Sequence, residues 1–214
     1  MVRKLRSPTR TITVKGGQGF QGELPSPKGT TFPLVFDSVA SLMGAVHLEH
    51  RPEVAAIAFE AEKSEYVDDT GASVWAIHDY HAALNTGELE FVEVKYSLAS
   101  LSAKELQKLE RLRRGMAREG KELHLIFRDT LEENGYIQTV LLLRRFGLLN
   151  FSEKSKSVAL ERLSEFEAAT MDGWLKRAQR VSVATGLLYH LLYHQRLPLL
   201  YERLVATALL PCRG

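Results

Sequence analysis

The chain has 214 residues, of which 45% are hydrophobic and 25% charged, and its formal net charge is +2. This composition is typical of a soluble globular protein, and the length suffices for one sizeable domain with or without a small appendage. The net charge is too small to indicate nucleic-acid binding, so any basic surface must come from local clustering. A single cysteine, Cys212, excludes an internal disulfide, and no apolar run predicts a membrane span or a signal peptide. We therefore expect a cytoplasmic protein.

The first segment of the chain differs in amino-acid composition from the rest. Residues 1–31 are rich in arginine, lysine, glycine and proline, which predicts an extended basic arm. Over residues 37–50 the apolar positions recur at the helical period. Asp37 or Ser38 can cap this predicted helix, and Pro52 ends it.

Alternating patterns and short apolar runs then predict a mixed α/β domain. The predicted strands cover residues 54–59, 65–67, 74–83, 89–96 and 123–127. We expect 74–83 and 89–96 to form the central pair, joined by the turn signal Asn85-Thr86-Gly87. A helix over 103–119, capped by Ser102, precedes the last strand.

The rest of the chain is predicted to be helical. The helical segments are 137–149, 158–166, 171–192 and 199–210. We place the domain boundary near Asn150, which gives an α/β domain of residues 1–150 and a small all-helical C-terminal domain of residues 151–214.

Asp79, Glu93 and Lys95 are the residues that indicate a catalytic site. Glu93 and Lys95 occupy alternate positions of a predicted strand, so their side chains project from the same face. A hairpin would bring Asp79 to the same sheet edge. Two carboxylates beside an amine suit metal-dependent phosphodiester hydrolysis, because the carboxylates can bind Mg²⁺ and the lysine can orient water or neutralise developing charge. A solvated charged strand is the alternative interpretation of this spacing.

Several short segments occur in a consistent order over roughly residues 3–130. They are Arg6-Ser7-Pro8-Thr9-Arg10, Phe36-Asp37-Ser38, Leu48-Glu49-His50-Arg51-Pro52-Glu53-Val54, Glu65-Tyr66-Val67-Asp68, Asp79-Tyr80, Val92-Glu93-Val94-Lys95, Leu106-Gln107-Lys108-Leu109-Glu110 and Leu125-Ile126-Phe127-Arg128-Asp129. Taken together, this ordered set resembles the TnsA family, the endonuclease subunits of heteromeric bacterial transposons.

The resemblance implies a restriction-endonuclease-like fold, a mixed sheet flanked by helices, and cleavage of transposon 5′ ends. It implies Mg²⁺ as the cofactor, with Mn²⁺ as a substitute. Asp79 and Glu93 would be the metal ligands and Lys95 the catalytic lysine. The implied partners are transposon-end DNA, a TnsB-like transposase that cuts the 3′ ends, and a TnsC-like AAA+ ATPase.

Ser41 departs from the family pattern, because the resemblance implies a glutamate at this helix position. Serine is a poor Mg²⁺ ligand, so weaker metal binding is expected. Asp37 lies one helical turn earlier on the same face and could help to hold the ion, although a plain N-cap is the alternative role for it. His78 stands where the family usually has a proline, which is a smaller departure.

Two other hypotheses remain beside the endonuclease subunit, and the departure at Ser41 favours the first of them. The first is a catalytically impaired TnsA-like subunit that acts as a DNA-binding and assembly scaffold. The second is a stand-alone restriction or repair nuclease, which would be active without a partner transposase.

Two groups of residues outside this site could also bind a ligand. Arginines on the helix over 103–119 could contact DNA phosphates, although they alternate with glutamates as on a solvated helix face: Arg111, Arg113, Arg114 and Arg118. His190 and His194 have a spacing that would allow them to share a metal. The leucines around them favour a packed helix face instead.

Overall fold

The computed structural model describes residues 20–199 except 31–32, 61–62, 69–70 and 165–169. Most of the predicted basic arm and nearly all of the predicted helix over 199–210 lie outside these ranges. The chain divides into two compact units between Leu131 and Glu132. Within the described ranges, no helix is both long enough and apolar enough to cross a membrane.

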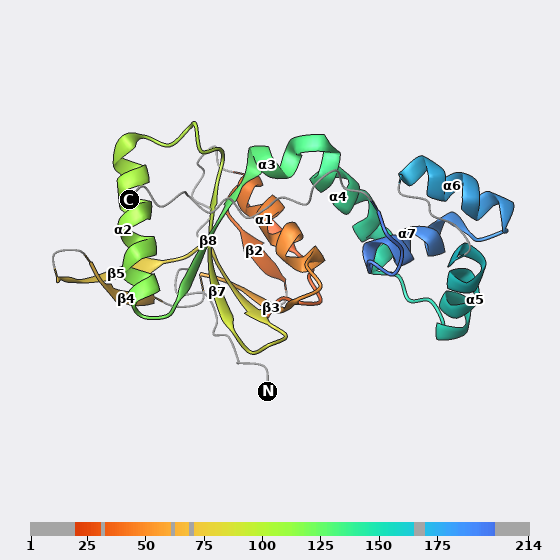
Figure 1. The fold of residues 1–214 in the computed structure, drawn as a ribbon, viewed down its shortest axis with the longest axis horizontal. Helices are drawn as coiled ribbons and strands as arrows, with labels where there is room; N and C mark the ends of the chain where they lie inside the picture. The colour runs from red at the N-terminus through yellow and green to blue at the C-terminus, as the bar shows by residue number, and fades with distance from the viewer. Residues whose placement is uncertain (1–19, 31–32, 61–62, 69–70, 165–169, 200–214) are drawn as a thin grey trace. The chain divides into compact units, whose positions relative to one another are not determined.

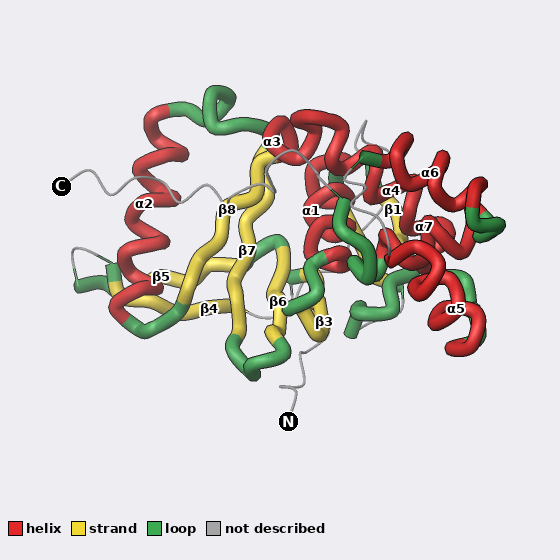
Figure 2. Tube along the Cα trace, turned by 45° about the vertical axis from the view of Figure 1, so that its right-hand side comes forward, coloured by secondary structure: helices red, strands yellow, loops and turns green. Residues whose placement is uncertain are grey.

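The first unit is built on a mixed sheet of four strands in the order β3-β6-β7-β8 (Figures 1 and 2). β3 and β6 run antiparallel, as do β6 and β7, whereas β7 and β8 run parallel. The strand bounds are Val54–Phe59 for β3, Tyr80–Leu84 for β6, Leu89–Lys95 for β7 and Glu122–Phe127 for β8. The sequence therefore predicted β3, β7 and β8 correctly to within about two residues at each end.

The segment over 74–83 was predicted as one strand and forms two, which belong to different sheets. β5 (Ser73–Ile77) pairs with β4 (Lys63–Val67), whereas β6 pairs with β3 and β7. The break falls at His78 and Asp79, where the Asp79 carbonyl accepts a hydrogen bond from Glu60 N over 3.1 Å. The sequence gives no sign of this break, because neither glycine nor proline marks it.

A second two-stranded sheet precedes the first helix and was not predicted. It pairs β1 (Gly22–Leu24) with β2 (Leu34–Phe36), and both strands are only three residues long. Strands this short carry too few residues for a clear alternating pattern.

Two helices flank the four-stranded sheet in the predicted places. α1 (Val39–His50) is capped by Ser38, whose hydroxyl accepts a hydrogen bond from Ser41 N over 3.0 Å. Asp37 is therefore not the N-cap. α2 (Ala103–Arg118) begins with a capping box between Ser102 and Glu105, as the sequence predicted.

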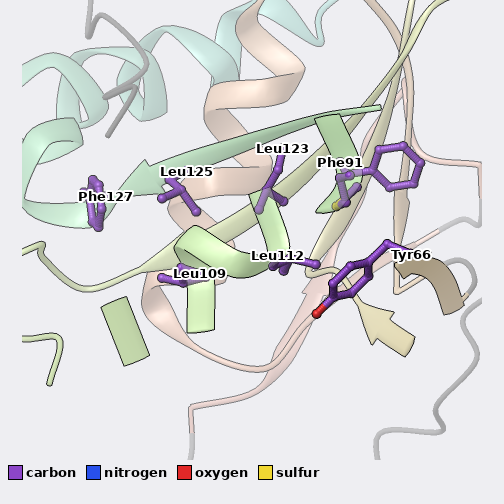
Figure 3. Close-up of a cluster of buried hydrophobic side chains, with 8 residues drawn as sticks. Tyr66, Phe91, Leu109, Leu112, Leu123, Leu125 and Phe127 are labelled. Carbon is purple, nitrogen blue, oxygen red and sulfur yellow. The ribbon is translucent and has the colours of Figure 1, made fainter. Parts of the chain in front are cut away.

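The main apolar cluster lies between α2 and one face of the sheet (Figure 3). Its buried members are Tyr66, Phe91, Leu109, Leu112, Met116, Leu123, Leu125 and Phe127. Because side chains alternate along a strand, Glu93 and Lys95 face the same side as Phe91. Val94 faces α1, and α1 approaches so closely that a Cβ added at Gly44 would lie 2.6 Å from Val94 Cγ2.

The second unit is helical throughout its described residues. A short α3 (Arg128–Glu132) and a 3₁₀ turn (Glu133–Gly135) lead into it. Its helices are α4 (Tyr136–Gly147), α5 (Glu153–Ser164), α6 (Met171–Arg180) and α7 (Thr185–Tyr193).

Two predictions for this half of the chain need correction. The predicted helix over 171–192 is interrupted between α6 and α7, where Ser182 has a φ of 56°. The units divide at Leu131 and Glu132 and not near Asn150, because α4 packs against α7. This packing is so close that a Cβ added at Gly147 would lie 2.0 Å from the ring of Tyr193.

Candidate functional site

Asp79, Glu93 and Lys95 converge on one face of the four-stranded sheet. Tyr80 pairs with Val92, so Asp79, which directly precedes β6, lies opposite Glu93 on β7. Lys95 Nζ lies 2.7 Å from Glu93 Oε2 and 3.6 Å from Asp79 Oδ2. The Val94 amide also donates a hydrogen bond to Asp79 Oδ2 over 2.7 Å. The structure thus brings together the three side chains that the hairpin spacing singled out.

Glu93 and Lys95 line a cleft of about 430 Å³. Most of the other lining side chains come from β5 and α2, such as Trp75, Ile77, Glu105 and Lys108, and Leu101 just before α2 also lines the cleft. The side chains of Asp79 and Lys95 are 28% and 29% exposed, and that of Glu93 is 11% exposed. The charged groups are therefore shielded from bulk water but remain accessible to a ligand.

The two carboxyl groups have pKa values shifted in opposite directions. Burial, followed by the negative charge of Glu93, raises the pKa of Asp79 to about 6. Burial also acts to raise the pKa of Glu93, but contacts with His78 and Lys95 outweigh it and lower that pKa. Burial acts to lower the pKa of Lys95, yet the two carboxylates outweigh it and raise that pKa. Opposed shifts in a cleft are typical of functional sites.

Asp79→Asn is expected to stabilise the first unit at pH 7.5 by about 1–2 kcal/mol. The pKa of Asp79 is about 6 in the folded protein against an ordinary value of 3.8, so folding favours the protonated form. The ionised carboxylate therefore destabilises the fold above pH 6, and this penalty disappears as the pH falls toward 4. Urea unfolding of both proteins at pH 7.5 and pH 4 measures the effect, and a variant less stable than wild type at pH 7.5 would contradict it.

The donor set suits a magnesium or manganese ion. Asp79 and Glu93 supply hard carboxylate oxygens on one face, and Mg²⁺ is commonly held by one or two carboxylates together with water and substrate phosphate. Among the described residues there is no group of three or more histidine, cysteine, aspartate or glutamate side chains that could hold a metal ion. A metal here would therefore depend on these two carboxylates.

Ser41 does not supply a third ligand. Its side chain is buried, and its Oγ lies 2.6 Å from the Tyr80 hydroxyl, which also donates a hydrogen bond to the Ser41 carbonyl. Tyr80 points to the face of β6 opposite to that of Asp79. Asp37 lies close enough for its charge to contribute to the raised pKa of Asp79.

His78 also belongs to this site, although the sequence did not predict it as a site residue. It is fully buried, and its Nδ1 lies 3.4 Å from Glu93 Oε1. Its position next to Asp79 was the available signal, but nothing in the local sequence shows that it faces Glu93.

The four arginines of α2 do not share one surface. Arg111, Arg114 and Arg118 are exposed, whereas Arg113 is half-buried. At about 100° per residue the three exposed arginines lie together, on a side of the helix roughly 90° from the cleft-lining Lys108 and roughly 130° from the cleft-lining Leu112. Two of them bond to backbone carbonyls, Arg114 to Glu110 and Arg118 to Asp68.

His190 and His194 stabilise the end of α4. His190 Nδ1 lies 3.2 Å from the Phe146 carbonyl, and His194 Nε2 lies 3.0 Å from the Gly147 carbonyl. This arrangement agrees with the packed helix face that the surrounding leucines predicted.

Neither the known protein-family models nor the curated proteins contain a match to this chain.

Proposed function

We propose that this chain is a TnsA-like endonuclease subunit of a heteromeric transposase, which cleaves the 5′ ends of a transposon with Mg²⁺. The main support for this proposal is that three side chains converge on one face of the sheet: Asp79, Glu93 and Lys95. Asp79 and Glu93 would hold the ion, which when bound would polarise the phosphate and activate water. Lys95 lies beside both carboxylates, where it can neutralise charge that develops on the phosphate.

The order of elements in the first unit supports the same proposal. α1 is followed by the antiparallel strands β3, β6 and β7, then by α2 and the parallel strand β8. This order is compatible with a restriction-endonuclease-like arrangement, with the second unit as a helical C-terminal domain that contacts DNA or a partner protein. The proposed partners are transposon-end DNA, a TnsB-like transposase and a TnsC-like AAA+ ATPase.

A second candidate function is a scaffold that binds DNA and the partner proteins without cutting. The observation that favours it is the buried Ser41 hydroxyl, which is hydrogen-bonded to Tyr80 and leaves the site with two principal carboxylates. A scaffold tolerates a missing ligand, whereas a nuclease loses metal affinity.

A reconstituted cleavage assay separates the two functions. Purified protein, the partner transposase and transposon-end DNA are incubated with Mg²⁺, with Mn²⁺ or with a chelator. The proposal predicts metal-dependent nicks at the 5′ ends that disappear when Asp79, Glu93 and Lys95 are all replaced by alanine. Full transposition by that triple variant would refute the nuclease and support the scaffold. The scaffold predicts instead that Arg111→Glu, Arg114→Glu and Arg118→Glu together impair transposition.

A further inference from the structure

His78 lies at the point where the chain passes from the β4–β5 sheet into the four-stranded sheet. It directly precedes Asp79, and both residues lie in the short segment between β5 and β6 that places them at the site. Its side chain is fully buried. The ring packs against Phe91 with centroids 5.2 Å apart at 64°, and against His81 with centroids 5.8 Å apart. These contacts restrict the orientation of the imidazole.

The polar atom that faces this imidazole belongs to Glu93. His78 Nδ1 lies 3.4 Å from Glu93 Oε1, and neither ring nitrogen forms a hydrogen bond of ordinary geometry with any described residue. A buried N–H without an acceptor costs free energy, so the carboxylate is the acceptor that the local chemistry favours. The second oxygen, Glu93 Oε2, contacts Lys95 over 2.7 Å on the cleft side.

We propose that His78 is a positioning residue, which donates from Nδ1 to Glu93 Oε1 and so orients the Glu93 carboxylate toward a divalent ion and the DNA phosphate in the cleft. This inference rests on the proposed function, because it assigns a supporting residue to the same site. Groups that hydrogen-bond to ligating carboxylates commonly determine how well those carboxylates bind a metal. The lowered pKa of Glu93, to which His78 contributes, agrees with this arrangement.

The test compares two replacements of similar size at position 78. His78→Asn keeps a side-chain N–H near the place of Nδ1, whereas His78→Leu fills the space without a donor. We expect calorimetry to show that His78→Leu weakens Mn²⁺ binding by about 10–100-fold and that His78→Asn stays within about threefold of wild type. Thermal unfolding of each variant separates this effect from a loss of packing.

His124→Asn is the matched control. His124 is also a buried histidine beside glutamates, with Nε2 3.3 Å from Glu122 Oε1 and 3.7 Å from Glu90 Oε1. It lies on β8, outside the cleft, so its replacement should leave Mn²⁺ affinity unchanged. Equal Mn²⁺ affinity of His78→Leu and wild type would overturn the inference.

A measurement without metal separates this inference from the proposed function. Proton–nitrogen NMR of the wild type should show a slowly exchanging Nδ1–H of His78, and Glu93→Ala should abolish that signal. If the signal is present but the wild type binds no Mn²⁺, the positioning contact stands and the metal-dependent nuclease fails. If the signal is absent or unaffected by Glu93→Ala, the positioning role is wrong, whatever the result of the cleavage assay.

Discussion

On the proposed nuclease function, Lys95→Ala is expected to cut transposon-end DNA at least about 100-fold more slowly than wild type, as is usual when a group that stabilises transition-state charge is removed. Lys95 Nζ lies within 4 Å of both site carboxylates, and their charges raise its pKa, so it is a cation at neutral pH. Under the proposed function, its removal takes away a positive charge that lies beside both carboxylates and can offset charge on the phosphate. Because the loss falls on the transition state, DNA affinity should change much less than the cleavage rate.

Lys121→Ala is the matched control for this variant. Lys121 is a partly exposed lysine that also pairs with a glutamate, Glu119, but it does not line the cleft. Its replacement should leave the cleavage rate unchanged. The readouts are single-turnover cleavage, DNA binding and circular dichroism of both variants. Undiminished cleavage by folded Lys95→Ala protein would remove Lys95 from the mechanism.

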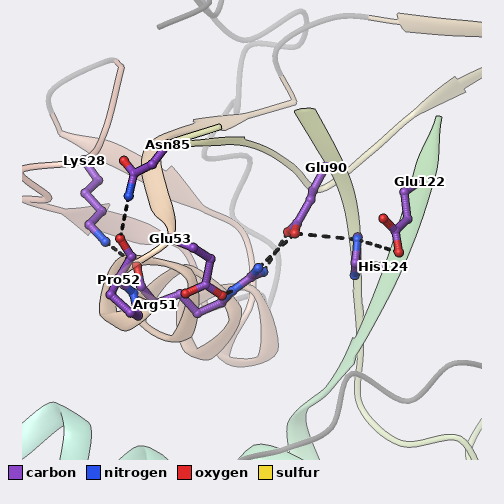
Figure 4. Close-up of polar contacts among 8 residues, drawn as sticks. All are labelled: Lys28, Arg51, Pro52, Glu53, Asn85, Glu90, Glu122 and His124. Atoms are coloured by element: carbon purple, nitrogen blue, oxygen red, sulfur yellow. Dashed lines mark hydrogen bonds and ion pairs between the residues drawn. The ribbon is translucent and has the colours of Figure 1, made fainter. Parts of the chain in front are cut away.

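Arg51→Met is expected to lower the free energy of unfolding of the first unit by about 2–4 kcal/mol, slightly less than the roughly 3–5 kcal/mol for breaking a fully buried ion pair, because the Arg51 side chain is 18% exposed. Arg51 follows α1 and makes a two-pronged contact with Glu90, through Nη1 over 2.7 Å and Nη2 over 2.9 Å (Figure 4). The side chain of Glu90 is only 8% exposed. Without the guanidinium, the only ion-pair contact of Glu90 with a described residue is the weaker one with His124.

Two further variants show whether this cost comes from the buried charge. Glu53 also contacts Arg51, but its side chain is 49% exposed, so Glu53→Gln should cost less than about 1 kcal/mol. The double variant Arg51→Met with Glu90→Gln should recover part of the stability, because no buried charge is then unpaired. Urea unfolding of wild type, the two single variants and the double variant measures these differences. A loss below about 0.5 kcal/mol for Arg51→Met would show that the pair contributes little to the fold.

Glu90 and Glu93 show how one strand can carry acidic residues with different roles. Both lie on β7 and both are largely buried. Their odd spacing places them on opposite faces of the sheet. Glu90 pairs with an arginine that follows α1, whereas Glu93 shares its face with Lys95 and lies opposite Asp79. We infer that Glu90 stabilises the fold and that Glu93 is available for chemistry.

The sequence by itself determined the features whose physical causes lie within a few neighbouring residues. The Ser102 capping box starts α2, and Pro52 marks the end of α1. The apolar run over 123–127 forms β8. The alternation along β7 was enough to predict that Glu93 and Lys95 lie on one face of the sheet. Caps, turns and strand alternation depend on local geometry, so they can be read from adjacent residues.

Only the tertiary structure decided which distant residues meet. It divided the segment over 74–83 between two sheets, and it placed Asp79 opposite Glu93 with His78 behind it. It joined the Ser41 hydroxyl to Tyr80, and it assigned α4 to the second unit through its packing on α7. These outcomes depend on strand pairing and helix packing between segments far apart in the chain. Such pairings depend on burial and hydrogen bonding across the whole unit. A local sequence pattern does not indicate which distant segments will pair.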